Sequence, residues 1–525
     1  MQGQKEFTPK LIYSVNIDQL VAKDNFYRLL KRTLNLHWLY KATEKYYGSE
    51  GQESIDPVVF FKICLVGYLN GIHSDRKLVD YCSDSFSIRL FLGYDIDENL
   101  PWHSTISRTR HLYGEEEFKI LFEKVFSLCA ESGMVLGHTQ AIDGAFLKAN
   151  ASKDSLEVKQ VNESIDTYLL ENIKANEDAR RAAKNNRADD EQKKMDGDGD
   201  DQKKDLSELN TRYERQKEKY KGMPGDYKGK FLSNKTNYSP TDPDARIAVK
   251  PGKPRDLYYS GQIAVDTAKH VITHAQTFLA DNRDGAFLKE IVQKTKIRLN
   301  KYGFKMDSCL ADGAYSSGEN YEYLEQNHIT PYIPLLGGAK GGSENFIYDD
   351  KKDIYICPNN KILKGSGRVV DDGRGHLVKK YFSLRSDCNK CPIRNTCISD
   401  KAKTKRVQHS IYKSHFEKAE ERQKSNKGQI MKRKRSSTVE PVWGTLINFL
   451  GLRRMTSRGI KCANQALLMA SACYNLKKYL KYIQRRGITN ANTRQETIGD
   501  FLIRFFTVPK FIWLRYDRGN FLDCQ

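Results

Sequence analysis

Three carboxylates are the residues of this chain whose types and surroundings best suit chemistry. They are Asp143 in QAIDGAFLK, Asp312 in CLADGAYSS and Glu440 in STVEPVWGTLINFL. The two aspartates follow short apolar runs typical of β-strands, and the glutamate lies near the start of a predicted amphipathic helix. Oxygen ligands of this kind suit Mg²⁺ or Mn²⁺. Two such ions, roughly 3.5–4 Å apart, can activate water or a sugar hydroxyl against a phosphodiester.

Each of these carboxylates also has a purely structural interpretation. Asp-Gly is a common turn dipeptide, so Asp143 and Asp312 could simply close turns. The run Ser-Thr-Val-Glu that ends at Glu440 fits a capping box, in which the glutamate only satisfies amides at a helix N-terminus. Because Pro441 would remove a first-turn donor, a longer or kinked helix stays open. Gly144 leaves room beside Asp143 for a metal and a phosphate.

The chain from residue 258 predicts strands that alternate with helices and would position the two aspartates. Two strands, in YYSGQIAVDT and HVITHAQTFLA, are joined by a tight turn at Ala268 and Lys269. There follow a helix over 284–303, a short strand ending at Asp312, a helix over 317–327 and the strand ITPYIPL. Together with the Asp143 strand, this order predicts an α/β fold with a mixed sheet flanked by helices, as in the ribonuclease H-like architecture.

Residues 1–135 predict helices alone. Asp56 caps a helix that ends at Gly71 and is apolar on nearly every side, so this helix should be buried. Ser74 starts a second helix that closes near Gly93.

A third helix, over STISRTRHLYG, is predicted to be capped by Ser104 and to expose Arg108 and Arg110. Short helices with tight glycine turns and an arginine-bearing last helix suggest a helix-turn-helix-like DNA-binding module. A plain helical bundle with a solvated arginine face is the alternative.

Four cysteines have a spacing that suits a metal. Cys357, Cys388, Cys391 and Cys397 follow the pattern C-x30-C-x2-C-x5-C. The C-x2-C pair brings two thiolates to one ion, and four thiolates select Zn²⁺ in a closed structural site. Free thiols in a β-rich insertion are the alternative. The other cysteines stand mostly in apolar runs typical of a core.

Length and charge bound the function further. A chain of 525 residues is too long to fold around a single hydrophobic core, so we expect about two to four domains. Lys and Arg number 87 against 66 Asp and Glu, a net charge of +21 that predicts a polyanionic partner such as DNA. The excess concentrates in residues 401–525, which hold 27 basic and 8 acidic side chains. With no signal-peptide pattern and no spanning apolar stretch, we expect a cytoplasmic protein without a membrane partner.

These patterns divide the chain into parts. Residues 151–230 are rich in Lys, Asp, Glu, Asn and Gln and cannot bury a core, so they predict an exposed helical hairpin or a disordered insertion. The predicted parts are a helical DNA-binding domain (1–135), a catalytic core (136–150 and 231–337), the charged insertion (151–230), a cysteine-rich β insertion (338–405), C-terminal helices of the core with Glu440 (406–487) and a tail (488–525).

Several of these segments resemble DDE-type transposases of bacterial insertion sequences. The matching stretches, between about residues 5 and 485, are FTPKLIYSVNIDQLV, YYGSEGQESIDPVVFFKICLVGYLNGIHSDRKL, LPWHSTISRTRHLYG, GHTQAIDGAFLKANAS, LADGAYSSGE and STVEPVWGTLINFLGLRR. They are similar to the subgroup with an N-terminal helical domain and a cysteine-bearing insertion before the catalytic glutamate. The resemblance implies a ribonuclease H-like catalytic domain with Asp143, Asp312 and Glu440 as the divalent-metal triad.

The resemblance also implies how such a protein would act. It would bind the terminal inverted repeats of its own element, cut a strand and transfer the 3′ end to target DNA, as a homodimer when two ends pair. Related enzymes often carry a Tyr, an Arg and a Lys around the glutamate to grip phosphate, but Ile447 stands where the lysine would be. Arg435, Arg453 and Arg454 could replace that grip. A DNA-binding repressor derived from a transposase and a structure-specific nuclease are the alternative functions.

Overall fold

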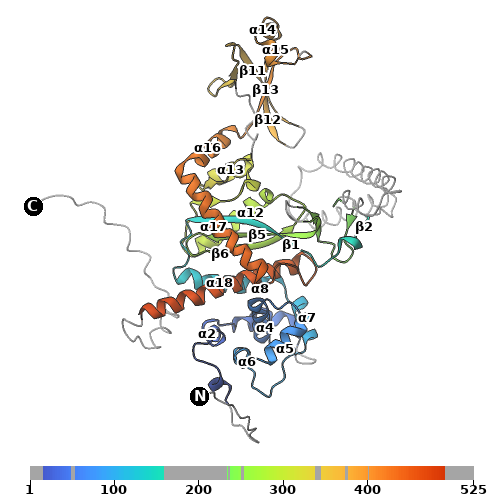
Figure 1. The fold of residues 1–525 in the computed structure, drawn as a ribbon, viewed down its shortest axis with the longest axis vertical. Coiled ribbons are helices and arrows are strands. Elements are labelled where there is room, and N and C mark those ends of the chain that lie inside the picture. The colour runs from blue at the N-terminus through green and yellow to red at the C-terminus, as the bar shows by residue number, and fades with distance from the viewer. Residues whose placement is uncertain are drawn as a thin grey trace, which may run out of the picture. The chain divides into compact units, whose positions relative to one another are not determined.

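The structure is a computed structural model that describes residues 16–48, 54–158, 233–234, 237–249, 254–336, 345–372, 376–399 and 401–490 (Figure 1). The chain divides into two units, Met1–Leu476 and Lys477–Gln525. All sites and contacts below belong to the first unit, and the second contains the end of helix α18 (Ile460–Asn490). The predictions made for residues 159–232 and 491–525 lie outside the described residues.

The N-terminal region is helical, as predicted. Its elements are α1 (Ile17–Leu20), α2 (Phe26–Thr33), α3 (Trp38–Thr43), the 3-10 turn η1 (Glu44–Tyr46), α4 (Pro57–Asn70), α5 (Asp75–Ser83), α6 (Phe86–Leu92), α7 (His103–Leu112) and α8 (Glu115–Glu131). Helix α4 is confirmed at both ends, because Asp56 accepts the amides of Val58 and Val59 and Gly71 adopts the left-handed conformation. Most of its side chains are buried, which makes α4 the core of this region.

Within the described residues no single helix is long and apolar enough to span a bilayer, and the bent pair α4–α5 passes that test only as a pair.

One predicted helix is in fact two helices. The prediction of a single helix from Ser74 to Gly93 is wrong, because Ser85 adopts an extended conformation between the end of α5 and the start of α6. The two outer ends are confirmed: the Ser74 side chain caps α5, and Gly93 closes α6 in the left-handed conformation.

Helix α7 begins earlier than predicted and uses its arginines differently. It starts after Trp102, so Ser104 is not its N-cap and instead accepts a hydrogen bond from Arg108 at 3.2 Å. Arg108 is exposed, as predicted. The prediction that Arg110 is exposed is wrong. Its two terminal nitrogens donate to the two carboxylate oxygens of Asp75 at 2.7 and 2.9 Å, which ties α7 to α5.

The main sheet has the strand order β6–β5–β1–β7–β8. Pairing is antiparallel from β6 to β1 and parallel from β1 to β8. The short strand β4 pairs with the first residues of β5, and β2 pairs with β3 apart from this sheet. The predicted β5–β6 hairpin and the mixed α/β order are confirmed. The strands are β1 (Thr139–Lys148), β2 (Glu157–Val158), β3 (Asn237–Tyr238), β4 (Arg246–Ala248), β5 (Asp256–Asp266), β6 (Val271–Leu279), β7 (Ser308–Leu310) and β8 (Thr330–Tyr332).

Helices cover both faces of this sheet (Figure 1). Helix α17 (Asn426–Asn448) contacts β1, β7 and β8. A Cβ atom at Gly261 would lie 2.9 Å from Leu147 and 3.1 Å from Trp443, so α17 packs on the Leu147 face of the sheet. Helix α12 (Leu288–Lys301) covers the opposite face, where Arg298 donates to His274 at 3.1 Å. Helices α13 (Gly318–Gln326) and α16 (Lys413–Lys424) pack on each other and on β8.

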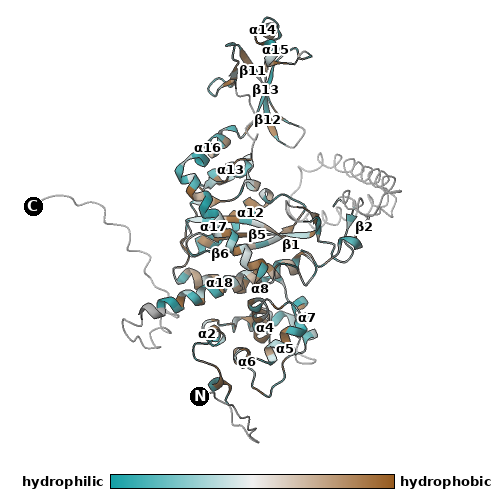
Figure 2. Cartoon of the chain, viewed as in Figure 1, coloured by the Kyte–Doolittle hydropathy of each residue, from teal (hydrophilic) through white to brown (hydrophobic). Residues whose placement is uncertain are grey.

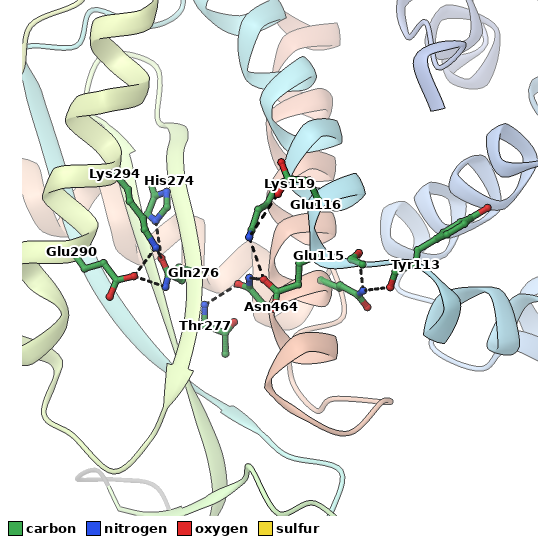
Figure 3. A network of polar contacts seen from close by, with 12 residues as sticks. Tyr113, Glu115, Glu116, Lys119, His274, Gln276, Thr277, Glu290, Lys294 and Asn464 are labelled. Atoms are coloured by element: carbon green, nitrogen blue, oxygen red, sulfur yellow. Dashed lines mark hydrogen bonds and ion pairs between the residues drawn. The ribbon is translucent and has the colours of Figure 1, made fainter. Parts of the chain in front are cut away.

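Helix α18 shields the edge strand β6 with side-chain amides. The Asn475 carboxamide accepts from the Ile272 amide and donates to the Ile272 carbonyl, both at 2.8 Å. Asn464 accepts from the Thr277 amide at 3.0 Å (Figure 3). Because an edge strand otherwise presents unpaired backbone groups, these two asparagines take the place of a neighbouring strand.

The N-terminal helices are joined to the sheet through polar contacts. Asn464 donates to Glu115 of α8 at 2.9 Å (Figure 3). Arg298 of α12 donates to Glu123 of α8 at 2.6 Å. Burial, followed by the charge of Arg298, lowers the pKa of His274 to about 3, so this imidazole is neutral and can accept the Arg298 hydrogen bond.

A second sheet is antiparallel throughout, in the order β13–β12–β11–β10–β9. Its strands are β9 (Ile347–Asp349), β10 (Ile354–Ile356), β11 (Ile362–Asp371), β12 (Leu377–Ser383) and β13 (Arg406–Ser410). Its core consists of Phe346, Tyr355, Leu363, Tyr381 and Val407. The short helices α14 (Arg385–Asn389) and α15 (Arg394–Cys397) lie in the connection from β12 to β13.

We expect Asn475→Ala to lower the free energy of unfolding by about 2–4 kcal/mol, because both backbone groups of Ile272 would lose their buried partner. Urea-induced unfolding of the full-length protein measures this change. Asn448→Ala, at the exposed end of α17, is the matched control and should cost less than about 0.5 kcal/mol. Equal losses in the two variants would contradict the edge-shielding role of Asn475.

We expect Arg110→Ala to lower the free energy of unfolding by about 2–3 kcal/mol. Asp75 would keep a mostly buried charge without its partner. Both side chains are about a fifth exposed, so the loss of stability should be below the roughly 3–5 kcal/mol that follows when a fully buried pair is broken. Arg108→Ala should change stability by less than about 0.5 kcal/mol. Chemical denaturation separates the two variants, and a stable Arg110→Ala protein would show that the Asp75 pair contributes little.

Candidate active site

The paired strands β1 and β7 lead to Asp143 and Asp312. The last parallel pair between these strands joins Ala141 to Leu310. Asp143 and Asp312 each follow this pair by two residues, Asp143 within β1 and Asp312 past the end of β7. Both carboxylates also lie near the buried Tyr315, because burial, followed by the charge of Asp284 and then their own charges, raises the pKa of its hydroxyl.

Asp312 lies just past the strand and also closes a turn. Strand β7 ends at Leu310, and the Asp312 carboxylate accepts the Ala314 amide at 2.9 Å, which caps the 3-10 turn η6 (Gly313–Tyr315). The turn interpretation of this residue is therefore correct. It does not exclude a ligand role, since this contact engages only Oδ1.

Glu440 lies inside α17 and not near a helix start. The helix begins at Asn426 and is capped by Ser425, so the capping-box interpretation is wrong. Ser437, the expected cap, instead donates its hydroxyl to the Lys434 carbonyl at 3.1 Å. The longer helix left open by Pro441 is the one observed. The predicted apolar stripe is buried at Val439, Val442, Trp443 and Leu446, and Glu440 beside it is 63% exposed.

Arg435 connects two of the three carboxylates. Its guanidinium lies 3.6 Å from Asp143 Oδ1 and 3.8 Å from Glu440 Oε1. The side chains of Arg435 and Asp143 are each 17% exposed, so their charges interact with little screening by water. Asp143 and Glu440 therefore share one cationic partner, the guanidinium group of Arg435.

Sequence reasoning missed a buried polar group behind the aspartates. Asp284, 7% exposed, accepts a hydrogen bond from Gln262 at 2.9 Å, and Gln262 accepts one from Tyr315. A Cβ atom at Gly144 would lie 2.2 Å from the Gln262 amide nitrogen and 2.9 Å from Asp284 Oδ1. Gly144 therefore admits this group behind β1, a role different from the predicted one of leaving room beside Asp143. The only signal in the sequence was the glycine itself.

Basic side chains surround the carboxylates. Helices α16 and α17 begin with strongly hydrophilic segments (Figure 2), and α17 carries the run Lys432–Arg433–Lys434–Arg435. A pocket of about 730 Å³ lies between the end of β8 and these two helices, and its lining includes Tyr332, Arg422, Lys432 and Arg433.

Arg453 and Arg454 lie in the loop that follows α17, and both are exposed. Arg454 forms a bridge with Lys148 at the end of β1, and the next amide donates to the Lys148 carbonyl at 2.8 Å. The loop also packs on the N-terminal helices, because a Cβ atom at Gly451 would lie 2.4 Å from the His73 ring. The two arginines are therefore held at the end of the strand that carries Asp143.

The four predicted zinc ligands are half-buried and near one another. Cys357 accepts the Lys361 amide at 3.3 Å, and Cys388 is hydrogen-bonded to Ser383 at 2.9 Å. Burial and the charges of the other three thiols raise the pKa of Cys397, against an opposing effect of Lys405. Among the described residues, however, no three His, Cys, Asp or Glu side chains converge closely enough to hold a metal ion, either here or at the carboxylates.

Comparison with protein families gives two matches. Residues 15–112, which include α1 to α7, match the family described as Transposase domain (DUF772). Residues 356–480, which include the four cysteines and Glu440, match the family described as Transposase DDE domain. No curated protein matches the chain. Asp143 and Asp312 lie outside both matched segments. The two matches, each over less than half of the chain, support an insertion-sequence DDE transposase.

Proposed function

We propose that this transposase binds the terminal inverted repeats of its element, cuts a DNA strand and joins the freed 3′-hydroxyl to target DNA. The observation that carries the proposal is the position of Arg435, whose guanidinium lies 3.6 Å from Asp143 and 3.8 Å from Glu440 beside the parallel pair of β1 and β7. The three carboxylates, on β1, after β7 and on α17, would form an acidic centre within a chain of net charge +21. That combination suits catalysis on a polyanion.

The strand order supports a ribonuclease H-like catalytic domain. Apart from the short strand β4, the main sheet contains β1, β5, β6, β7 and β8. If these five are numbered 1 to 5 along the chain, their order in the sheet is 3-2-1-4-5, with an antiparallel half and a parallel half. In such a sheet, a carboxylate on the central strand and one just after the neighbouring parallel strand can face the same site. Helix α17 then adds the third carboxylate from above the same face.

The carboxylates are the ligands we propose for Mg²⁺ or Mn²⁺. Asp143 and Asp312 would share one ion, and Glu440 would complete a second site. The donors are hard oxygens, and a cationic group of Arg435 already lies between Asp143 and Glu440, as expected for a centre that needs positive charge. When bound, the ions would activate water and the 3′-hydroxyl and would neutralise charge on the phosphate. Arg435 would then be released from Asp143 to contact a phosphate.

The basic residues around this centre are proposed to bind the DNA backbone. Arg108 on α7 and Arg453 and Arg454 beside β1 are exposed, and Lys432 and Arg433 line the pocket next to α17. Contacts of this type fix the position of the duplex without reading its sequence. We assign no base contact to Arg110, because its guanidinium is engaged by Asp75. Pairing of two element ends would make the active form a homodimer.

Cys357, Cys388, Cys391 and Cys397 are proposed to hold a structural Zn²⁺. Burial and the three neighbouring thiols raise the pKa of Cys397, and a soft cation shared by the four cysteines would favour their thiolate forms. The observed thiols are not yet at ligand distances from one centre, so binding would draw α14 and α15 toward the turn that carries Cys357.

We expect Asp143→Asn, Asp312→Asn and Glu440→Gln each to lower the rates of cleavage and joining by more than about 100-fold. Loss of a metal ligand should cost more than the roughly 10- to 100-fold that follows when a residue behind the ligands is altered. A labelled duplex that carries the terminal repeat, incubated with full-length protein and Mg²⁺, measures both steps. Asp307→Asn is the matched control, because Asp307 lies near Asp312 in sequence but pairs with His138 at 2.8 Å on the surface.

Gel-shift binding of the same duplex should survive in all four variants. Binding without cleavage by the wild-type protein would indicate a repressor derived from a transposase. Cleavage without joining would indicate a nuclease.

The zinc proposal predicts about one Zn²⁺ per chain in protein purified without chelator, measured by elemental analysis. Cys391→Ser should lose most of this zinc, since three thiolates bind more weakly than four. Cys462→Ser, a half-buried cysteine outside the group, should retain it. Zinc-free wild-type protein with an unchanged melting temperature would contradict a structural ion.

A further inference from the structure

A buried hydrogen-bond network lies behind the two aspartates, on the face of β5 that points away from α17. The Tyr315 hydroxyl donates to Gln262 Oε1 at 2.5 Å. Gln262 Nε2 donates to Asp284 Oδ1 at 2.9 Å and to Ser260 Oγ at 3.0 Å. Tyr315, Gln262 and Ser260 are fully buried, and Asp284 nearly so. Both polar atoms of the Gln262 carboxamide are therefore engaged, and its orientation is fixed.

One end of this network packs against the backbone next to Asp143. Gln262 is the direct partner of Gly144 in the pairing of β1 with β5. A Cβ atom at Gly144 would lie 2.2 Å from Gln262 Nε2 and 2.9 Å from Asp284 Oδ1, so only glycine leaves space here. The carboxamide and Asp284 thus support the strand at the residue that follows Asp143.

The other end holds the turn of Asp312. Tyr315 closes the η6 turn, and its amide donates to the Asp312 carbonyl at 3.2 Å. Asn320, 2% exposed, donates to the Tyr315 carbonyl at 3.0 Å and to the Gly285 carbonyl at 2.8 Å. The turn that carries Asp312 and the turn that carries Asp284 are therefore fastened to each other.

We propose that Tyr315, Gln262 and Asp284 form a positioning network that holds Asp143 and Asp312 at the separation required for a shared divalent cation. The inference rests on the proposed function, because it assigns these residues a role only through the two aspartates. Burial, followed by the charges of Asp284, Asp143 and Asp312, raises the pKa of Tyr315 well above its usual range. The hydroxyl therefore stays protonated and remains the donor to Gln262. Residues that orient ligands from behind typically change metal affinity or activity by about 10- to 100-fold when altered.

Tyr315→Phe tests the proposal with the least disturbance, since it keeps the ring and removes the donor. Mn²⁺ binding to the full-length protein, followed by electron paramagnetic resonance, is the readout, and the ion lost in Asp312→Asn identifies the site. We expect its dissociation constant to rise about 10- to 100-fold in Tyr315→Phe. The Mg²⁺ concentration needed for half-maximal cleavage should rise in parallel. Gly144→Ala, which displaces the Gln262 carboxamide, should act in the same direction.

Tyr259→Phe is the matched control. Tyr259 is fully buried in the same strand as Gln262, and its hydroxyl donates to Asp242 at 2.6 Å, away from the aspartate pair. We expect this variant to lose stability but to bind Mn²⁺ as the wild type does. Wild-type Mn²⁺ affinity in Tyr315→Phe, or an equal loss in Tyr259→Phe, would overturn the positioning role and leave the proposed function intact. A wild-type protein that neither binds Mn²⁺ nor cleaves DNA would overturn both.

Discussion

The parallel pairing of β1 with β7 is the constraint on which the candidate site depends. Ala141 lies opposite Leu310, and two residues farther along are Asp143, within β1, and Asp312, in the turn after β7. A slip of one residue in this pairing would turn the side chains of one strand to the other face of the sheet, so the register determines where the chain leaves β7 toward Asp312. The antiparallel strand β5 holds β1 from the other side, and α18 satisfies the outer edge of β6 through Asn464 and Asn475. The outer edge of β6 is thus satisfied, and the strand that carries Asp143 lies at the centre of the sheet.

Helix α17 brings the third carboxylate to this pair by hydrophobic packing. Trp443 and Leu147 pack over Gly261, where a larger side chain would push the helix away from the sheet. Glu440 lies beside this buried stripe and Arg435 more than one turn earlier, which places both within reach of Asp143. The interior Pro441 removes one helical hydrogen bond, and the burial of Val439 and Val442 on either side offsets that loss. Packing therefore determines the position of the glutamate, whereas helix propensity alone would not.

Much of the architecture could be predicted from local patterns. Asp56 and Gly71 mark the ends of α4 correctly, and the apolar runs on both sides of Ala268 and Lys269 form the predicted hairpin. These signals are local, because a cap or a tight turn depends on a few neighbouring residues. The Ser-Thr-Val-Glu run misled because the same four residues occur inside a helix whose start lies farther back, where Ser425 supplies the cap.

The contacts that could not be predicted join residues far apart in the chain. The partner of Arg110 is Asp75 on another helix, so no pattern around Arg110 indicates that its charge is engaged. The Tyr315–Gln262–Asp284 network combines a strand and two turns, and each residue is unremarkable in its own segment. Gly144 was noticed, but its steric role becomes evident only when Gln262 is placed across from it. The zinc assignment of the four cysteines remains a prediction.

We propose that Asp143 and Asp312 share a divalent cation. Anomalous diffraction from crystals of the full-length protein grown with Mn²⁺ and its terminal-repeat DNA would locate that ion. We expect a manganese peak bound by both aspartates, with Arg435 moved away from Asp143 and toward a phosphate. A manganese peak that contacts neither aspartate, or a saturated crystal in which Arg435 still bridges Asp143 and Glu440, would contradict it.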